Sequence, residues 1–273
     1  MSWLEAIVLG IVQGLTEFLP VSSSAHISIV GQLFFGNADP GAAFTAVIQL
    51  GTETAVVVYF AKDIGRIISH WFLSLFGKIP RDDLDARMGW YVIIGSIPIV
   101  VAGLLFQNAI NTSLRNLWIT VAMMAGFGIV LLLVDMFSRE EYQLKHLNWL
   151  DGIAYGFAQM LALIPGVSRS GATIAGGLFL GYDREAATRY SFLLAIPAVY
   201  GSGLYELKDA IHVAGTPWPQ IGVATVLAFG VGLAIIHWFL KFVSTHSFKV
   251  FVWYRLAVAA IVAGLILGGV LTA

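Results

Sequence analysis

The residues from Gln13 to His26 read Gln-Gly-Leu-Thr-Glu-Phe-Leu-Pro-Val-Ser-Ser-Ser-Ala-His. This stretch places a carboxylate, three serines and an imidazole within otherwise apolar sequence. A second stretch, Pro165-Gly-Val-Ser-Arg-Ser-Gly171, follows about 146 residues later. Proline and glycine interrupt helices. Both stretches therefore predict breaks between helices, and their polar groups predict a site.

The composition around these stretches is typical of a membrane protein. The chain has 273 residues, of which 58% are hydrophobic and 11% are charged, whereas soluble domains carry about 25% charged residues. The net charge of −1 gives no indication of a nucleic-acid partner. The absence of cysteine excludes disulfides, thiolate metal sites and cysteine nucleophiles. The N-terminus has no basic region before a short apolar run, so we expect no cleaved signal peptide.

Six apolar segments are long enough to cross about 30 Å of hydrocarbon. Each must be helical, because lipid cannot satisfy free backbone amides. The predicted spans are 40–60, 88–107, 116–137, 184–207, 219–240 and 250–271.

Two further apolar stretches, 3–35 and 149–181, contain the breaks described above. Each half is about 15 residues long, which is short for a full crossing. We therefore predict two re-entrant hairpins, each made of a helix, a polar break and a second helix. The alternative is one kinked span or two tilted spans in each place.

The two hairpins resemble each other in sequence. A shift of about 146 residues aligns Trp3 with Trp149, Gly10 with Gly156, Gln13 with Gln159, and Val21-Ser22-Ser23-Ser24 with Val167-Ser168-Arg169-Ser170. Three predicted spans follow each hairpin, and an odd number of spans inverts the second copy. We thus predict an all-α integral membrane protein with one membrane domain, 1–273, built from inverted repeats 1–137 and 149–273.

The distribution of basic residues predicts the orientation. Loops on one side carry Lys62, Arg66, Lys78, Arg81, Arg87, Arg139, Lys145, Arg184, Lys241 and Lys249, whereas the other side carries Arg115 and Lys208. The first side is cytoplasmic by the positive-inside rule, so both termini are expected outside. Segment 63–78 is amphipathic and is expected to lie on the inner membrane surface.

Glu17 is the first candidate for chemistry. It lies four residues after Gln13, which places both on one helical face. An ionisable group at this depth costs at least about 2.5 kcal/mol unless it is paired or hydrated. The alternative is a carboxylate that ends its helix near water.

Ser22, Ser23 and Ser24 are expected at the start of the second half-helix. A helix N-terminus offers free amides and a positive dipole end, which suit an anion. His26 lies three residues after Ser23, and a serine beside a histidine is typical of an activated nucleophile. A membrane histidine that only bonds another helix is the alternative.

Arg169 is the most informative residue of the second stretch. Its guanidinium is always charged and needs an anion. Glu17 is one candidate partner. A phosphate is the other, held with help from Ser168, Ser170 and Thr173. Gln49 and Glu53 lie one turn apart in the span 40–60 and are candidates for the same cavity, and the alternative for Glu53 is to pair with an arginine such as Arg189 or Arg255.

The two motifs, from Gln13 to His26 and from Pro165 to Thr173, closely resemble the bacterial undecaprenyl-diphosphate phosphatase family. These BacA-type proteins are linked to bacitracin resistance, and the resemblance covers essentially the whole chain. It implies hydrolysis of undecaprenyl diphosphate to undecaprenyl phosphate and inorganic phosphate, which recycles the lipid carrier of peptidoglycan synthesis. It also implies a divalent cation, Mg²⁺ or Ca²⁺, at Glu17 and Gln13, although glutamine at 13 weakens a two-carboxylate site.

The resulting hypothesis is that Ser23 attacks the terminal phosphorus, while His26, oriented by Glu17, transfers protons. Phosphohistidine at His26, or water activated by Glu17, are alternatives. A lipid-phosphate transporter or flippase would use the same anion site, whereas an intramembrane serine protease would leave Arg169 without an anion. The expected partners are a polyprenyl diphosphate and membrane lipids of the bacterial inner membrane, with no nucleic acid. A homodimer remains open, and the site is expected to open outward.

Overall fold

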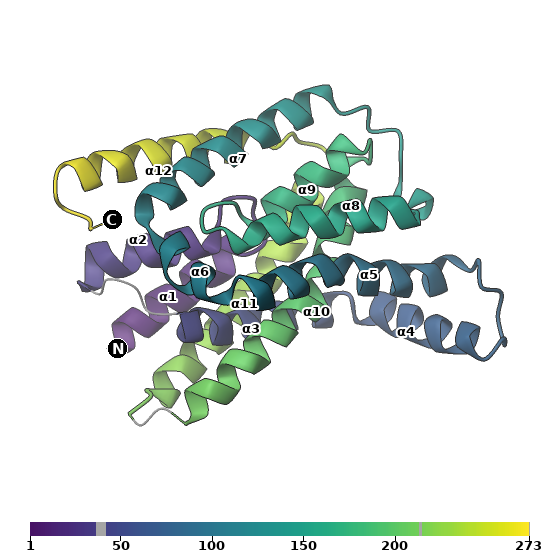
Figure 1. Ribbon diagram of the computed structural model, residues 1–273, viewed down its shortest axis with the longest axis horizontal. Helices are drawn as coiled ribbons and strands as arrows, with labels where there is room; N and C mark the ends of the chain where they lie inside the picture. Colours follow the sequence, from purple (N-terminus) through teal and green to yellow (C-terminus); the bar gives the residue numbers. More distant parts are fainter. Residues whose placement is uncertain (37–41, 213–214, 273) are drawn as a thin grey trace.

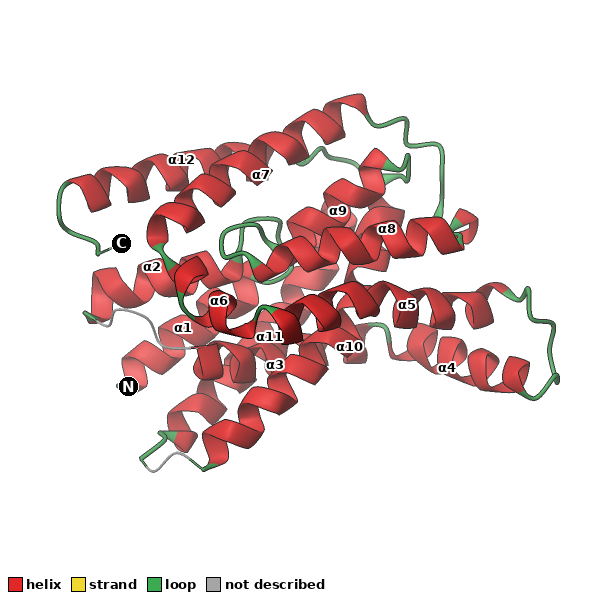
Figure 2. Cartoon of the chain, in the orientation of Figure 1, coloured by secondary structure: helices red, strands yellow, loops and turns green. Residues whose placement is uncertain are grey.

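A computed structural model describes residues 1–36, 42–212 and 215–272 and shows a helical protein (Figures 1 and 2). Within these ranges the only β-type pairing is an isolated bridge between Tyr142 and Tyr182. The α-helices are α1 (Trp3–Thr16), α2 (Ser23–Phe35), α3 (Ala42–Tyr59), α4 (Ala61–Leu75), α5 (Leu84–Leu105), α6 (Gln107–Asn111), α7 (Leu117–Phe137), α8 (Trp149–Met160), α9 (Arg169–Phe179), α10 (Arg184–Ile211), α11 (Trp218–Val243) and α12 (Lys249–Leu267).

All six predicted spans fall on helices, although the start of the first lies partly outside the described residues. Among the described residues, four helices are long and apolar enough to cross a membrane, namely α5, α7, α11 and α12. A fifth candidate is the pair α3 and α4, which is bent by 78° after Tyr59. Helix α10 has the length of a span but begins with Arg184 and Glu185 and ends with Lys208 in its last turn. The chain is thus a multi-pass membrane protein with four or five candidate spans.

Both predicted breaks separate two helices. Helix α1 ends at Thr16 and α2 begins at Ser23, and the two helices pack against each other. Helix α8 ends at Met160 and α9 begins at Arg169, and this pair packs in the same way. A 3₁₀ turn, Leu161–Leu163, lies in the second break.

Helix contacts recur in matching pairs. Helix α1 packs on α11 as α8 packs on α5, and close approach depends on glycine in both places. A Cβ on Gly10 would lie 2.5 Å from the carbonyl oxygen of Ala224, and a Cβ on Gly156 would lie 2.6 Å from that of Gly95. Helix α3 also packs on α10, and α7 packs on α12.

Helix α4 occupies most of the segment predicted to be amphipathic. It packs along α5 (Figure 1) and exposes apolar side chains such as Ile68 and Phe72. Its polar side is tied to the start of α5, because Arg66 donates to Asp85 at 2.7 Å. This helix has no counterpart among the described residues of the second half of the chain.

The two termini lie at the same end of the molecule (Figure 1). The loop between α4 and α5 and the loop between α7 and α8 lie at the opposite end (Figure 1). That opposite end carries Lys78, Arg81, Arg139 and Lys145. The arrangement therefore separates the chain ends from the basic loops.

Candidate active site

The two breaks, far apart in the sequence, meet inside the protein. Arg169 donates from Nη2 to Oε1 of Glu17 at 2.7 Å. Ser170 donates its hydroxyl to the backbone carbonyl of Leu19 at 3.0 Å. The expected approach of the two hairpin tips is thus present, and it brings a carboxylate and a guanidinium together.

In each break, the residue before the second helix has the same unusual backbone conformation. Ser22 precedes α2 with φ of 75°, and Ser168 precedes α9 with φ of 72°. Positive φ is uncommon for residues other than glycine, and such strain gathers at functional sites. The two serines are equivalent in the 146-residue alignment. The first N–H groups of both helices lack intrahelical partners, so both helix starts suit an anion.

A cavity of about 480 Å³ opens at this meeting point. Glu17, Ser22, Ser23, Ser24, Gln49, Ser168 and Arg169 line its polar end, and Gln107, Ser202, Tyr205 and Glu206 are further polar residues of its lining. Its apolar walls come from the second half of α5, from α6, from α10 and from the turn between α8 and α9. They include Ile99, Val100, Leu104, Ile110, Leu163 and Val199. A polar end beside apolar walls fits a ligand with an anionic head and a hydrocarbon tail.

Glu17 is the centre of the polar part and is 5% exposed. It accepts hydrogen bonds from Nε2 of Gln13 at 2.8 Å, from Oγ of Ser23 at 2.6 Å, and from Arg169. The contact with Ser23 joins a hydroxyl to a carboxylate that can take its proton. Ser23 and Glu17 thus have the geometry of a nucleophile and its base.

His26 makes other contacts than those expected. Its Nδ1 lies 2.7 Å from the carbonyl oxygen of Ser22, and its Nε2 lies 2.8 Å from the hydroxyl of Tyr254. A carbonyl oxygen only accepts, so Nδ1 carries a proton. Both ring nitrogens are occupied, and His26 does not line the cavity. The expected hydrogen bond between His26 and Ser23 is therefore replaced by the bond between Ser23 and Glu17.

Gln49 and Glu53, both in α3, lie on this side of the protein as expected. Gln49 lines the cavity, whereas Glu53 is 0% exposed and lies behind it. Glu53 pairs with Arg169, whose Nη2 is 3.5 Å from Oε2. The suggested pairing with Arg189 or Arg255 was wrong, because Arg189 pairs with Asp63 at 3.2 Å and Arg255 binds backbone carbonyls.

The predicted phosphate-binding hydroxyls differ in position. Ser168 lines the cavity and accepts the N–H of Gly171 at 3.2 Å. The hydroxyl of Ser170 is buried between Ser168 and the Leu19 carbonyl. Thr173 is 0% exposed and donates to the Arg169 carbonyl at 2.8 Å. Ser170 and Thr173 thus hold the second break rather than line the cavity.

Arg255 of α12 contributes to the site in a way that the sequence reading missed. It is fully buried and donates to five backbone carbonyls, at 2.8 to 3.3 Å. These carbonyls belong to Pro20 in the first break, Gly166 and Val167 in the second, and Met123 and Met124 in α7. One signal was available: Arg255 lies within an apolar helix with no acidic residue one turn away.

The residues expected to hold a divalent cation fit that role in their chemistry. Oε1 of Gln13 is buried and has no hydrogen-bond partner among the described residues, and Nε2 of the same side chain contacts Glu17. Amide and carboxylate oxygens are the ligands that Mg²⁺ and Ca²⁺ prefer.

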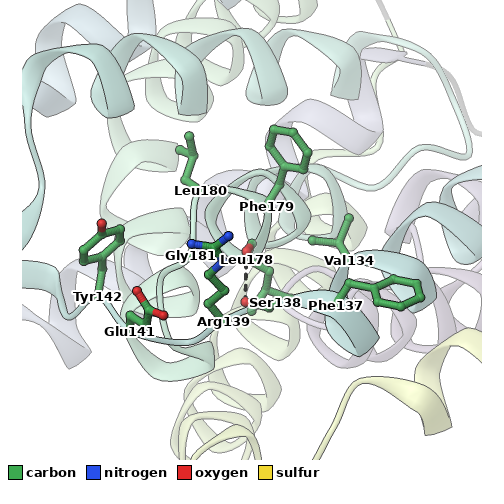
Figure 3. Close-up of a pocket in the computed structure, with 10 residues that line it drawn as sticks. All are labelled: Val134, Phe137, Ser138, Arg139, Glu141, Tyr142, Leu178, Phe179, Leu180 and Gly181. Carbon is green, nitrogen blue, oxygen red and sulfur yellow. Dashed lines mark hydrogen bonds between the residues drawn. The ribbon is translucent and has the colours of Figure 1, made fainter.

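A second cavity, of about 420 Å³, lies between the end of α7 and the turn after α9 (Figure 3). Its lining includes Phe137, Arg139, Glu141, Tyr142 and Phe179. It contains none of the predicted site residues, and a hydrogen bond from Ser138 to the Leu178 carbonyl crosses it at 2.9 Å. The polar groups of the two breaks are all in the first cavity or behind it.

Comparison with known proteins identifies the family of the chain. The family described as "Bacitracin resistance protein BacA" matches residues 6–261. A protein of Paenarthrobacter aurescens (strain TC1) named "Undecaprenyl-diphosphatase" is 60% identical over 260 residues, which cover 94% of each chain. Proteins with the same name are 59% identical in Renibacterium salmoninarum, over 100% of this chain and 99% of that one, and 54% identical in Micrococcus luteus, over 100% of both. The chain thus belongs to the BacA family.

Proposed function

We propose that this protein is an undecaprenyl-diphosphatase, the activity for which its relatives are named. It hydrolyses undecaprenyl diphosphate to undecaprenyl phosphate and inorganic phosphate, recycles the lipid carrier for peptidoglycan synthesis and gives bacitracin resistance. The observation that carries this function is the meeting of Glu17, Ser23 and Arg169 at the polar end of an apolar cavity.

In the proposed reaction, Oγ of Ser23 attacks the terminal phosphorus while Glu17 accepts the Ser23 proton. The bond from this phosphorus to the bridging oxygen breaks, undecaprenyl phosphate departs, and Glu17 passes the proton to it. Water then attacks the phosphorus of phosphoserine and gives a proton to Glu17. The bond between phosphorus and Oγ of Ser23 breaks, inorganic phosphate leaves, and Glu17 returns the proton to Oγ of Ser23. The short contact between Ser23 and Glu17 supports these roles.

Arg169 and the starts of α2 and α9 neutralise the diphosphate in this proposal, with Ser22 and Ser168 beside it. Phosphoryl transfer depends mainly on positioning and charge neutralisation. His26 holds the carbonyl of Ser22, next to the nucleophile, and so positions Ser23. Ser170 and Thr173 support phosphate binding by fixing the second break. Phosphohistidine at His26 would need a rearrangement, whereas water activated by Glu17 remains the alternative reaction.

A divalent cation, Mg²⁺ or Ca²⁺, is part of the proposal. The free Oε1 of Gln13 beside Glu17 supports it. When bound, the cation supplies positive charge to the diphosphate oxygens.

We also propose six transmembrane helices and two re-entrant hairpins in an inverted repeat. The matching contacts of α1 with α11 and of α8 with α5 support this architecture. Both termini would lie outside the inner membrane, the cavity would open outward, and the basic loops would lie in the cytoplasm. A homodimer is a further hypothesis, for which the mass of the purified protein in detergent is the test.

The test is phosphate release from undecaprenyl diphosphate by purified protein in detergent. Wild type should release phosphate, and Ser23→Ala and Arg169→Ala should not. The matched controls Ser244→Ala and Arg139→Ala, at exposed positions away from the site, should retain activity. Because detergent abolishes transport, absence of release from folded wild-type protein would favour the transporter or flippase.

A further inference from the structure

The charges around Arg169 do not balance once a diphosphate is bound. Its Nη2 contacts two carboxylates, Glu17 at 2.7 Å and Glu53 at 3.5 Å. Two negative charges therefore share one guanidinium. Even with the buried Arg255 counted, these four side chains only reach neutrality. The diphosphate then has only the partial positive charges of the α2 and α9 N-termini as counter-charge, in a site where low solvation makes repulsion between like charges strong.

Glu53 is also the least satisfied carboxylate of this group. It is 0% exposed, and neither of its oxygens has a hydrogen-bond partner among the described residues. Buried polar groups nearly always have partners, and an unpaired buried charge is costly. Oε1 of Gln13, also 0% exposed, is in the same condition. Free buried oxygens on two helices, each attached to the Glu17 and Arg169 cluster, indicate a missing positive partner.

We propose that Glu53 is a carboxylate ligand of the divalent cation, together with Glu17 and Oε1 of Gln13. This inference rests on the proposed function and adds a ligand from α3 to it. Mg²⁺ and Ca²⁺ take oxygen ligands, and Mg²⁺ in phosphate sites typically has one or two carboxylates plus substrate oxygens. Nη1 of Arg169 has no hydrogen-bond partner in the described part of the chain, so it stays available for phosphate.

The competing explanation is that Glu53 serves only as a counter-ion that holds Arg169. A relocated carboxylate separates the two explanations. Gln13→Glu places a second carboxylate beside Glu17, in the position where the side-chain amide now contacts it. Such a residue restores charge to a cation site after Glu53→Gln, but it does not restore the contact between Glu53 and Arg169.

The experiment is a Mn²⁺ titration of the purified, substrate-free protein, with free Mn²⁺ measured by electron paramagnetic resonance. We expect Glu53→Gln to weaken binding at least about tenfold, since even groups that only orient ligands have effects of this size. Glu53→Asp should retain most binding, Gln13→Glu should strengthen it, and the double variant Gln13→Glu/Glu53→Gln should recover it. Glu141→Gln, at an exposed position, should match wild type.

Unchanged Mn²⁺ affinity in folded Glu53→Gln would overturn the inference, as would a loss that Gln13→Glu fails to restore. If Glu53→Gln does not fold, Glu53→Asp replaces it in the test. Asp keeps the carboxylate, so loss of Mn²⁺ binding in folded Glu53→Asp would contradict the inference that the carboxylate at position 53 is a cation ligand. Phosphate release by wild type, measured in parallel, distinguishes failure of the cation-ligand inference from failure of the proposed phosphatase function. Release with unaltered affinity in Glu53→Gln refutes only the cation ligand, whereas absence of release refutes the proposed function itself.

Discussion

At the residue scale, Glu17 accepts hydrogen bonds from three side chains, and only one of them, Ser23, offers a reactive hydroxyl. Glu17→Gln keeps the size of the side chain but removes its ability to accept a proton. We expect kcat to fall by about 10²–10⁴, the usual contribution of a positioned base. Phosphate release under saturating substrate measures this. Wild-type kcat in the Glu17→Gln enzyme would exclude Glu17 as the base.

His26 and Tyr254 give a prediction of a different size. Because His26 holds the Ser22 carbonyl and not Ser23, we expect His26→Ala to act through misplacement, at about 10²-fold in kcat. Tyr254→Phe keeps the stacked ring, 5.5 Å between centroids, and loses only its hydroxyl, so its effect should be smaller. If Glu17 is the base, as proposed, the shape of the pH–rate profile should not change in either variant. A changed profile in His26→Ala would indicate that His26 itself transfers protons.

The sequence predicted the residues whose chemistry conflicts with an apolar setting. Glu17, Ser23 and Arg169 stand out in this way, and the structure brings all three together. It did not predict the partners of His26 and Arg255. Those contacts depend on how α12 folds back against both breaks, and no pattern near residue 26 indicates a tyrosine 228 residues away.

At the scale of elements, Arg255 connects α12 and α7 to both breaks. Its guanidinium donates hydrogen bonds to carbonyl oxygens that would otherwise be buried without donors. Arg255→Met should therefore leave Pro20, Gly166 and Val167 partly unsatisfied and let the two breaks move apart. We expect phosphate release to fall at least about 10²-fold, by the cost of misplaced groups.

The matched variant for Arg255 is Arg255→Lys, which keeps the charge but has three donors on one nitrogen in place of a planar fork. We expect it to recover only part of the activity. Double electron–electron resonance between spin labels on α2 and α9 measures the separation of the two breaks. The distance distribution should broaden in Arg255→Met and stay narrow in Ser23→Ala. An unchanged distance with lost activity would mean that Arg255 acts on substrate and not on the breaks.

Asp83 provides a test at the turn between α4 and α5. It caps α5 by accepting the N–H groups of Asp85 and Ala86, at 3.1 and 3.0 Å. Loss of such a cap costs about 1 kcal/mol, or roughly 2 °C in the unfolding midpoint for a chain of this size. Asp83→Ala should show this loss in a thermal scan, whereas Asp83→Asn should retain most of the cap.

The same residue gives a pH dependence with a definite sign. The bond from the Ala86 N–H, and then the hydrogen bond from His70, lower the pKa of Asp83. A carboxylate with a lowered pKa stabilises the fold above its unfolded pKa of about 3.9 and loses that contribution as the pH falls through its folded pKa. The advantage of wild type over Asp83→Asn should therefore be present at about pH 6 and shrink below about pH 4. An advantage that grows in acid would contradict this assignment.

Helix positions were largely predictable because apolar length and Pro-Gly breaks are local features. The start of α2 after Pro20 and that of α9 after Pro165 follow directly from them. A change of direction between the span 40–60 and the surface segment 63–78 was predicted, but the angle of 78° was not, since neither proline nor glycine lies at Phe60 to indicate it. It arises where α4 turns to pack on α5, which is a tertiary contact.

At the scale of the whole molecule, the halves meet through equivalent parts. Thr54 and Tyr200 differ by 146 residues and share a hydrogen bond of 2.9 Å between their hydroxyls. Helices α3 and α10, which carry them, follow the pairs α1/α2 and α8/α9 respectively and pack together. Equivalent elements contact each other when a two-fold axis passes between them. For an axis in the membrane plane, the two breaks then approach mid-depth from opposite sides.

This arrangement makes the orientation testable with single cysteines, because the chain has none of its own. Thr272→Cys at the C-terminal end and Ser113→Cys after α6 should react with a membrane-impermeant maleimide on intact cells. Lys145→Cys, in a basic loop at the opposite end, should react only after the membrane is permeabilised, since basic loops stay in the cytoplasm. The reverse labelling pattern would show that the protein has the opposite orientation in the membrane, with the cavity open to the cytoplasm. Labelling of all three from one side would contradict the proposed odd number of spans between the two breaks, and with it the proposed inverted repeat.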